Sequence, residues 1–211
     1  SGYKEDENLF IFSYDWRLDI DWLAGDSPLV YHQGLKEKID EVKSLTGTDK
    51  VDIIAHSMGG LVVKKYLKKY DETFVDKFID IATPHLGAPK AFKTLMYGDD
   101  FGFNFVGYSL LDSQRIQIIS QNMPSIYQLL PSREYFNIND STIPNKDYQS
   151  YVGDVYDFDN NNIKGSLNYD QTMEFMKNTG RNYDLLALSV NFHREIDNLF
   201  VTNTFNIVGC G

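Results

Sequence analysis

The fold is decided by the stretch Val51-Asp52-Ile53-Ile54-Ala55-His56-Ser57-Met58-Gly59-Gly60. Its first residues are apolar except for Asp52, which predicts a short buried strand. The residues from Leu61 to about Tyr70 have apolar positions at helical spacing and predict a helix. The chain must therefore turn sharply between the two, and Ser57 lies in that turn. A serine placed between a strand and a helix in this way has a strained backbone and a raised hydroxyl, so Ser57 is predicted to be a nucleophile.

The residues beside Ser57 fit a nucleophile elbow. Small residues are expected two positions before and two positions after the serine, and Ala55 and Gly59 meet this expectation. The turn directs the backbone N–H of Met58 toward the place where an oxyanion would develop, and the start of the following helix adds a favourable dipole. One such donor contributes roughly 3 kcal/mol of transition-state stabilisation. The alternative, a turn that binds phosphate, would need a longer glycine-rich stretch and usually a lysine, and neither is present.

The segments around this stretch alternate between strand and helix. Apolar residues at helical spacing predict a helix from Leu35 to Leu45, which Gly47 ends. Strands are predicted over Leu9 to Tyr14, Val51 to Ala55, Phe78 to Ala82 and Phe205 to Val208. An alternation of this kind implies an α/β fold, in which a parallel sheet carries helices on both faces.

The middle of the chain lacks this alternation. It holds helix candidates separated by polar loops, namely Ser113 to Gln121, Ser125 to Leu130, Asp170 to Lys177 and Tyr183 to Leu199. We expect this region to be a mainly helical cap inserted between two strands of the sheet. The predicted domains are a core over residues 1–89, a cap over 90–200 and a returning core strand over 201–211.

The length, net charge and composition of the chain exclude some classes of function. The chain has 211 residues and a formal net charge of -10, so it lacks the basic surface that a nucleic-acid partner needs. It has 42% hydrophobic residues, enough for a core, but no stretch is long and apolar enough to span a bilayer. A soluble protein is therefore expected. Because Cys210 is the only cysteine, no intrachain disulfide is possible, and this agrees with either a cytoplasmic or an extracellular location. The sequence also leaves the oligomeric state open.

Four motifs give the chain a resemblance to a known family of enzymes. They are Tyr14-Asp15-Trp16-Arg17, Ala55-His56-Ser57-Met58-Gly59-Gly60-Leu61, Ile81-Ala82-Thr83-Pro84-His85-Leu86-Gly87-Ala88-Pro89, and the stretch from Met123 to Ser132. In these motifs, their order and their spacing, the sequence resembles the lecithin:cholesterol acyltransferases, lysosomal phospholipase A2 and related bacterial lipase-like proteins. The resemblance covers most of residues 9–136 and the last strand.

The resemblance implies an α/β-hydrolase core, incomplete at both ends in this chain. It also implies that Ser57 takes an acyl group from a lipid ester and passes it to water, as in a lipase, or to an alcohol, as in an acyltransferase. The expected partner is a lipid or small ester substrate, and transient contact with a membrane or lipid surface is expected as well. No cofactor or metal ion is expected. The candidate pocket residues are Tyr14, Asp15, Trp16, Arg17, His56, His85 and Leu86.

The base that Ser57 requires is not evident. A serine of ordinary pKa needs a histidine, and the histidine needs an orienting carboxylate. In this fold the chain order is serine, acid, histidine, and each follows a strand. We therefore expect the triad acid and histidine beyond Gly211, in a longer hydrolase, and expect little or no turnover from the 211-residue chain itself.

The four histidines differ as candidates for this base. His56 directly precedes Ser57 and is expected to be structural or to line the pocket, whereas His32 is expected to be solvated. His85 either lines the site or braces its loop through a hydrogen bond. His193 comes late enough in the chain and has Asp184 and Asp197 nearby, but it falls in a predicted cap helix.

Two further features have alternatives that the sequence leaves open. Asp15 and Arg17 are expected to pair and brace their motif, with Trp16 over the pocket. Asp157, Asp159 and Asn161 are spaced like the start of a calcium loop, but a solvated polar loop is favoured, because Asn162 stands where that loop needs glycine. A rival to the enzyme hypothesis is a non-catalytic module that retains the hydrolase scaffold as a lipid-binding surface.

Overall fold

A computed structural model describes most of the chain. The described residues are 2–25, 27–29, 31–70, 72–98, 113–137, 156–157, 162–163, 167–199, 201 and 203–209. The chain divides into two compact units. The first, here called the core unit, comprises Ser1–His85 and Asn198–Gly211, and the second, the cap unit, comprises Leu86–Asp197.

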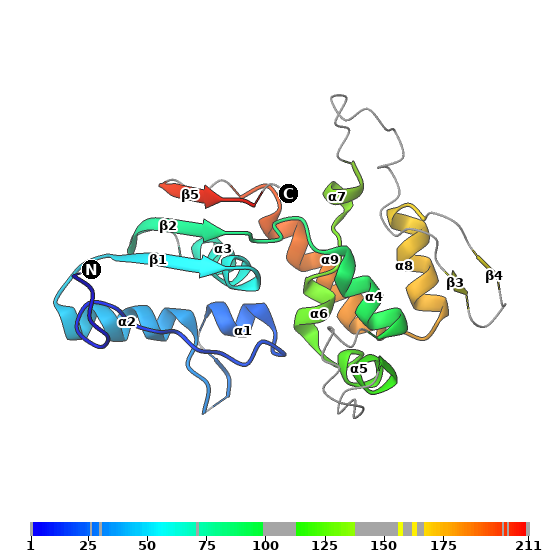
Figure 1. The fold of residues 1–211 in the computed structure, drawn as a ribbon, viewed down its shortest axis with the longest axis horizontal. Helices are drawn as coiled ribbons and strands as arrows, with labels where there is room; N and C mark the ends of the chain where they lie inside the picture. Colours follow the sequence, from blue (N-terminus) through cyan, green and yellow to red (C-terminus); the bar gives the residue numbers. More distant parts are fainter. Residues whose placement is uncertain are drawn as a thin grey trace. The chain divides into compact units, whose positions relative to one another are not determined.

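The core unit is built on a parallel sheet of three strands. The strands are β1 (Val51–His56), β2 (Val75–Ile81) and β5 (Thr204–Ile207), in the order β1-β2-β5 (Figure 1). The register pairs Ala55 of β1 with Asp80 of β2, and Asp80 with Asn206 of β5. Because the strands are parallel, their carboxyl ends lie at one edge, and Ser57 follows β1 at that edge.

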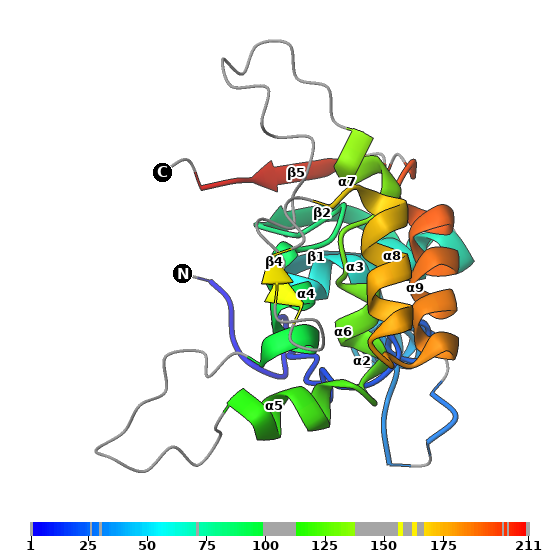
Figure 2. The ribbon, with the colours of Figure 1, turned by 90° about the vertical axis from the view of Figure 1, so that its right-hand side faces the viewer.

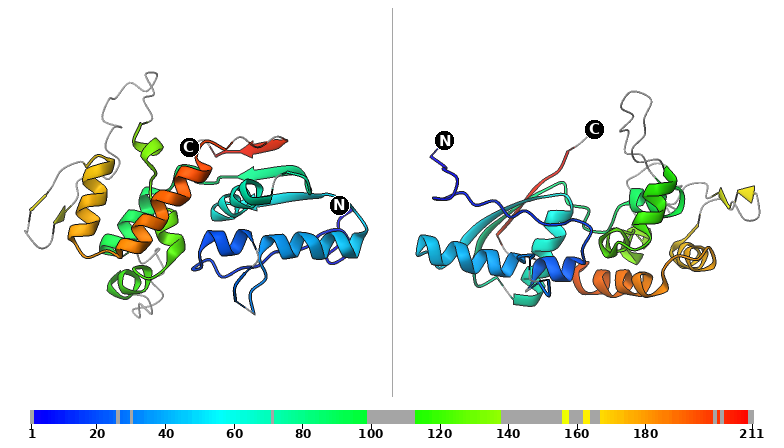
Figure 3. Two further views of the ribbon diagram at one scale, coloured as in Figure 1. Left: turned by 180° about the vertical axis from the view of Figure 1, so that it is seen from behind. Right: turned by 90° about the horizontal axis from the view of Figure 1, so that it is seen from below.

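Three helices accompany this sheet, and each has a local cause. Helix α1 (Ile20–Ala24) is capped by Asp19, and α2 (Leu35–Thr46) ends at Gly47, whose φ of 70° is the left-handed conformation of a helix C-cap. Helix α3 (Met58–Tyr70) follows Ser57 directly and buries most of its apolar side chains, including Leu61, Val62 and Tyr66. Viewed from below, the three helices gather on the same side of the strands (Figure 3).

The opposite face of the sheet is exposed in the part of the chain that the structure describes. Ile54, Phe205 and Ile207 point to that face and are 64%, 55% and 53% exposed. The predicted parallel sheet with flanking helices is confirmed. The prediction placed helices on both faces, whereas the described helices of this unit cover the face that carries Phe78 and Asp80.

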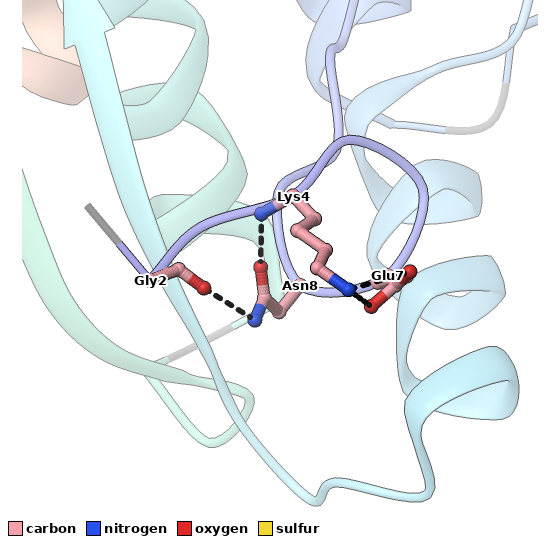
Figure 4. A network of polar contacts seen from close by, with 4 residues as sticks. All are labelled: Gly2, Lys4, Glu7 and Asn8. Atoms are coloured by element: carbon pink, nitrogen blue, oxygen red, sulfur yellow. Dashed lines mark hydrogen bonds and ion pairs between the residues drawn. The ribbon is translucent and has the colours of Figure 1, made fainter.

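The prediction of a strand over Leu9 to Tyr14 is wrong. In the described residues it forms no ladder beyond an isolated bridge between Glu5 and Leu9, and a strand exists only through its hydrogen-bonded neighbours. The residues before it close a small loop, shown in Figure 4. The backbone N–H of Lys4 donates to Asn8 Oδ1 at 2.7 Å, and Asn8 Nδ2 donates to the carbonyl oxygen of Gly2 at 3.3 Å.

The cap unit is mainly helical, as predicted. Its helices are α4 (Pro89–Tyr97), α5 (Ser113–Ser120), α6 (Pro124–Gln128), α7 (Arg133–Asn137), α8 (Tyr169–Asn178) and α9 (Tyr183–Ile196). Helix α6 packs against α9 (Figure 2), and one apolar cluster joins α4, α6, α8 and α9 through Leu95, Tyr127, Met176 and Leu186.

Several elements of the chain were not predicted. Helices α1, α4 and α7 were missed, as was the short antiparallel pair β3 (Tyr156–Asp157) and β4 (Asn162–Ile163). Pro89 occupies the first turn of α4, where its missing N–H is tolerated. No helix among the described residues is long and apolar enough to cross a membrane.

Candidate active site

The turn at Ser57 has the geometry of a nucleophile elbow. Strand β1 ends at His56, α3 begins at Met58, and Ser57 between them has a φ of 53°, which is uncommon for any residue except glycine. The turn is held by two backbone hydrogen bonds. The N–H of Ser57 donates to the carbonyl oxygen of Ile81 at 2.9 Å, and the N–H of Gly60 donates to the carbonyl oxygen of Ser57 at 3.0 Å.

Met58 is the first residue of α3 and is buried. The first N–H groups of a helix have no acceptor within the helix itself, and the helix dipole makes this end attractive to negative charge. The backbone N–H of Met58 is therefore one of the N–H groups at the start of α3 that have no acceptor within that helix.

The space around the two glycines differs from the expectation. A Cβ on Gly59 would meet the Tyr14 hydroxyl at 3.4 Å and the Ala55 Cβ at 3.7 Å, which are ordinary contacts. A Cβ on Gly60 would lie 1.8 Å from Thr83 Oγ1 and 2.8 Å from Asp80 Oδ1. The close approach that requires glycine is thus at Gly60, because that residue faces the end of β2.

A buried carboxylate, that of Asp80, lies next to Gly60. Asp80 is 0% exposed, and its carboxylate lies against two side chains of the loop that follows β2, of which only one forms a hydrogen bond with it. Thr83 Oγ1 donates a short hydrogen bond to Oδ1, and His85 Nε2 lies 2.6 Å from Oδ2. His85 therefore reaches the buried carboxylate from the loop after β2, and whether it lines the site or braces this loop stays a prediction.

Tyr14 reaches the elbow from the N-terminal segment. Its hydroxyl lies near Gly59, and its ring contacts that of Phe12, with centroids 5.5 Å apart. Burial raises the pKa of the Tyr14 hydroxyl, which therefore stays protonated through the physiological range. A protonated hydroxyl at this place is able to donate a hydrogen bond.

The residues after Tyr14 form the predicted ion pair. Arg17 Nε donates to Asp15 Oδ1 at 2.8 Å, and Arg17 Nη2 lies 2.5 Å from Asp15 Oδ2. These hydrogen bonds from Arg17 lower the pKa of Asp15 to about 2. Trp16, between the two, is 50% exposed, so its ring is available at the surface of the core unit.

The described residues supply no base at Ser57. No hydrogen bond joins the Ser57 hydroxyl to a histidine in the described parts of the chain, and His56 is exposed at the end of β1. His193 lies in α9 of the cap unit. Its Nδ1 is 2.8 Å from Asp197 Oδ1, and the two side chains are 5% and 6% exposed.

The remaining predicted residues lie in several places. Leu86 belongs to the cap unit, where its carbonyl oxygen accepts a hydrogen bond from the N–H of Ser132 at 2.9 Å. His32 is half-buried in the core unit. Most of the calcium-like stretch lies outside the described residues, and the described histidine and acidic residues form no group that could hold a metal ion.

Comparison with known proteins identifies the family to which the chain belongs. The sequence profile of the family "Lecithin:cholesterol acyltransferase" matches residues 1–205. The chain belongs to the lecithin:cholesterol acyltransferase family. Members of this family are enzymes of the serine hydrolase and O-acyltransferase class, and their chemistry is the hydrolysis or transfer of lipid acyl esters.

Relatives within the lecithin:cholesterol acyltransferase family match much of the chain. It is 32% identical over 140 residues to "Phospholipase A(1) LCAT3" of Arabidopsis thaliana, covering 64% of this chain and 30% of that protein. It is 25% identical over 160 residues to "Lysosomal phospholipase A and acyltransferase" of Homo sapiens, covering 73% of this chain and 37% of that protein. The chain thus spans about a third of the length of these curated relatives.

A solved structure supports the fold. The chain superposes with a TM-score of 0.53 and 15% identity on a chain in "The crystal structure of Tle4-Tli4 complex", covering 90% of this chain and 42% of that one. At this identity the likeness concerns the fold alone.

Asp80 was not predicted as part of this site. Its signal was present, because a single carboxylate in the apolar strand Phe78-Ile79-Asp80-Ile81 must be paired if it is buried. The sequence could not show which residues pair with it, since that depends on how the loop after β2 folds back.

Proposed function

We propose that Ser57 is the nucleophile of a lipid acyl ester hydrolase or acyltransferase. The observation that carries this proposal is the φ of 53° at Ser57, between the last residue of β1 and the first of α3. Strain of this kind at a non-glycine residue is retained where it serves a function, and here it raises one hydroxyl at the carboxyl edge of the sheet.

The proposed reaction has two steps. The Ser57 Oγ attacks the carbonyl carbon of the ester, and the carbonyl oxygen takes up the electron pair as an oxyanion. The backbone N–H of Met58 and the N-terminus of α3 stabilise this charge. The tetrahedral intermediate then expels the alcohol, which takes the proton removed from Ser57, and leaves an acyl group on Ser57. In the second step water or another alcohol attacks the acyl carbonyl and releases Ser57.

The proton of Ser57 requires a base during the first step. The structure assigns none among the described residues, because no histidine is hydrogen-bonded to Ser57 there. We therefore expect little or no turnover from the 211-residue chain alone, since a neutral serine hydroxyl is a weak nucleophile. That an acid and a histidine complete a triad with Ser57 stays a prediction made from the sequence.

The residues around the elbow are proposed to contact the substrate. Tyr14 has a protonated hydroxyl beside Gly59, Trp16 presents an exposed ring, and His85 belongs to the loop after β2. An apolar ring and a few polar groups fit a lipid ester, whose acyl chain is apolar and whose ester group is polar. Whether water or an alcohol receives the acyl group depends on how the site excludes water.

The experiment compares the full-length protein with its Ser57→Ala variant on p-nitrophenyl butyrate and on phosphatidylcholine vesicles. We expect the variant to lose about 10³-fold or more in kcat, because it lacks the attacking atom. Asp52→Asn is the control, since Asp52 is exposed at the other end of β1 and contacts Lys77. An unchanged rate in Ser57→Ala would remove Ser57 from the mechanism. Binding of vesicles without turnover by the full-length protein would favour a non-catalytic lipid-binding module.

A further inference from the structure

Asp80 is a buried carboxylate that the proposed reaction does not use. It lies in β2, is fully buried, and pairs in register with Ala55, two residues before Ser57. Placing a carboxylate in a protein interior is unfavourable unless it is paired and hydrogen-bonded. A residue of this kind next to an elbow therefore calls for an explanation from its contacts.

Both contacts of Asp80 come from the segment that follows its own strand. Thr83 Oγ1 donates to one carboxylate oxygen, and His85 Nε2 lies 2.6 Å from the other. The chain reverses toward Asp80 at Ala82, which has a φ of 50° and donates its N–H to the carbonyl oxygen of Ile207 at 2.9 Å. We call Asp80, Thr83 and His85 the β2 clamp.

The β2 clamp is in direct contact with the helix that carries the elbow. A Cβ on Gly60 would overlap Thr83 Oγ1 at 1.8 Å and Thr83 Cγ2 at 2.7 Å, so the first turn of α3 rests on Thr83. The carbonyl oxygen of Ile81, between Asp80 and Ala82, accepts the hydrogen bond from the N–H of Ser57. The end of β2 thus touches the elbow both through the backbone of Ser57 and through the first turn of α3.

We infer that Asp80 is a positioning residue for Ser57, acting through Thr83 and His85. The β2 clamp fixes the end of β2 and the first turn of α3, and these hold Ser57 and the Met58 N–H in the geometry that attack requires. This inference rests on the proposed role of Ser57 as nucleophile. No hydrogen bond joins Asp80 to Ser57 in the described residues: Oδ1 of Asp80 accepts from Thr83, and Oδ2 lies 2.6 Å from His85 Nε2 without a hydrogen bond.

The test uses the full-length protein with p-nitrophenyl butyrate and four variants. Thr83→Val keeps the shape of the side chain but removes the hydroxyl, and His85→Ala removes the other partner of Asp80. Thr83→Ser retains the hydroxyl, and Asp52→Asn removes an exposed carboxylate on the neighbouring strand. Reaction with a fluorophosphonate counts the active sites, so kcat is obtained per competent molecule and is not lowered by unfolded protein.

We expect Thr83→Val and His85→Ala each to lose about 10- to 100-fold in kcat per active site, because a small displacement of reacting groups slows the chemical step. The KM of Thr83→Val is expected to stay within about threefold of the wild-type value, since Thr83 is not among the proposed substrate contacts. Thr83→Ser should retain the wild-type kcat within about threefold, and Asp52→Asn should be unchanged.

Two results would overturn the inference. One is a normal kcat per active site in both disruptive variants. The other is an equal loss in Thr83→Val and Thr83→Ser, which would show that the hydroxyl bonded to Asp80 is irrelevant. If Ser57→Ala keeps the wild-type rate, the proposed function itself has failed, and this outcome is distinct from both.

Discussion

The backbone N–H of Ser57 donates a hydrogen bond to the carbonyl oxygen of Ile81, 2.9 Å away. This bond continues the parallel ladder of β1 and β2 by one residue, into a position where Ser57 has already left the strand with a φ of 53°. The strained residue is therefore anchored to the neighbouring strand on one side and to α3 on the other. Such anchoring is what allows an uncommon backbone conformation to persist in a folded protein.

The contrast between the two glycines of α3 gives the first prediction. Gly60→Ala should destabilise the protein by at least about 2 kcal/mol, because the new methyl group would overlap Thr83 and Asp80. Gly59→Ala should be neutral or stabilising by up to about 1 kcal/mol, because its Cβ meets only ordinary contacts and alanine favours the helix. Urea unfolding of both variants measures this. Equal stabilities would contradict the tight packing at Gly60.

The ion pair of Asp15 and Arg17 predicts a dependence of stability on pH. The pKa of Asp15 falls from 3.8 to about 2 in the folded protein because Arg17 donates hydrogen bonds to its carboxylate. A lowered pKa means that the pair stabilises the folded state above about pH 4 and that this contribution is lost as the pH falls through about 2.

The measurement compares wild type with Asp15→Asn by urea unfolding at several pH values. The difference in stability should be constant above about pH 5 and should shrink steadily between about pH 4 and pH 2. A difference that stays the same across this range would show that the Asp15 carboxylate is not stabilised in the folded state.

Gly87 lies two residues before the start of α4 and gives a prediction for the cap unit. It has a φ of 90°, and a Cβ there would lie 2.2 Å from the carbonyl oxygen of Leu130. Gly87→Ala should therefore destabilise the cap unit by more than about 2 kcal/mol. Gly47→Ala is the matched control, because Gly47 has a φ of 70° with open space around it, and only the backbone penalty of about 1–2 kcal/mol applies.

The buried pair of His193 in α9 and Asp197, the residue that follows α9, predicts strong coupling between the two residues. Removing one partner leaves the other buried without it, which destabilises proteins by about 3–5 kcal/mol. In a double-mutant cycle, His193→Gln and Asp197→Asn together should therefore destabilise much less than the sum of the single changes. The exposed pair Arg133 and Asp170, at 2.6 Å, serves as the comparison and should show far weaker coupling. Additive effects at His193 and Asp197 would contradict the pairing.

The elements that could be predicted are those with a local cause. Three local signals are the apolar run of β1, the glycine that ends α2 and the proline that starts α6. Each signal acts within a few residues, and the structure has each element close to the residues predicted for it. The turn at Ser57 belongs to the same class, because a strand, a small-residue turn and a helix follow one another without a gap.

The elements that were missed depend on contacts between distant residues or on weak local signals. Leu9 to Tyr14 has the composition of a strand but no neighbour to pair with in the described residues. The β2 clamp needs the loop after β2 to fold back at Ala82, and no pattern in the sequence announces a left-handed alanine. The five-residue helices α1 and α7 are too short to show a clear hydrophobic period.

The most direct test of the central claim is the identity of the residue that becomes acylated. The full-length protein is mixed with a p-nitrophenyl ester, quenched in acid within milliseconds and digested, and the peptides are analysed by mass spectrometry. We predict a mass increase equal to the acyl group on the peptide that contains Ser57, and its absence in Ser57→Ala. An acyl group on any other residue, with Ser57 unmodified, would contradict the account.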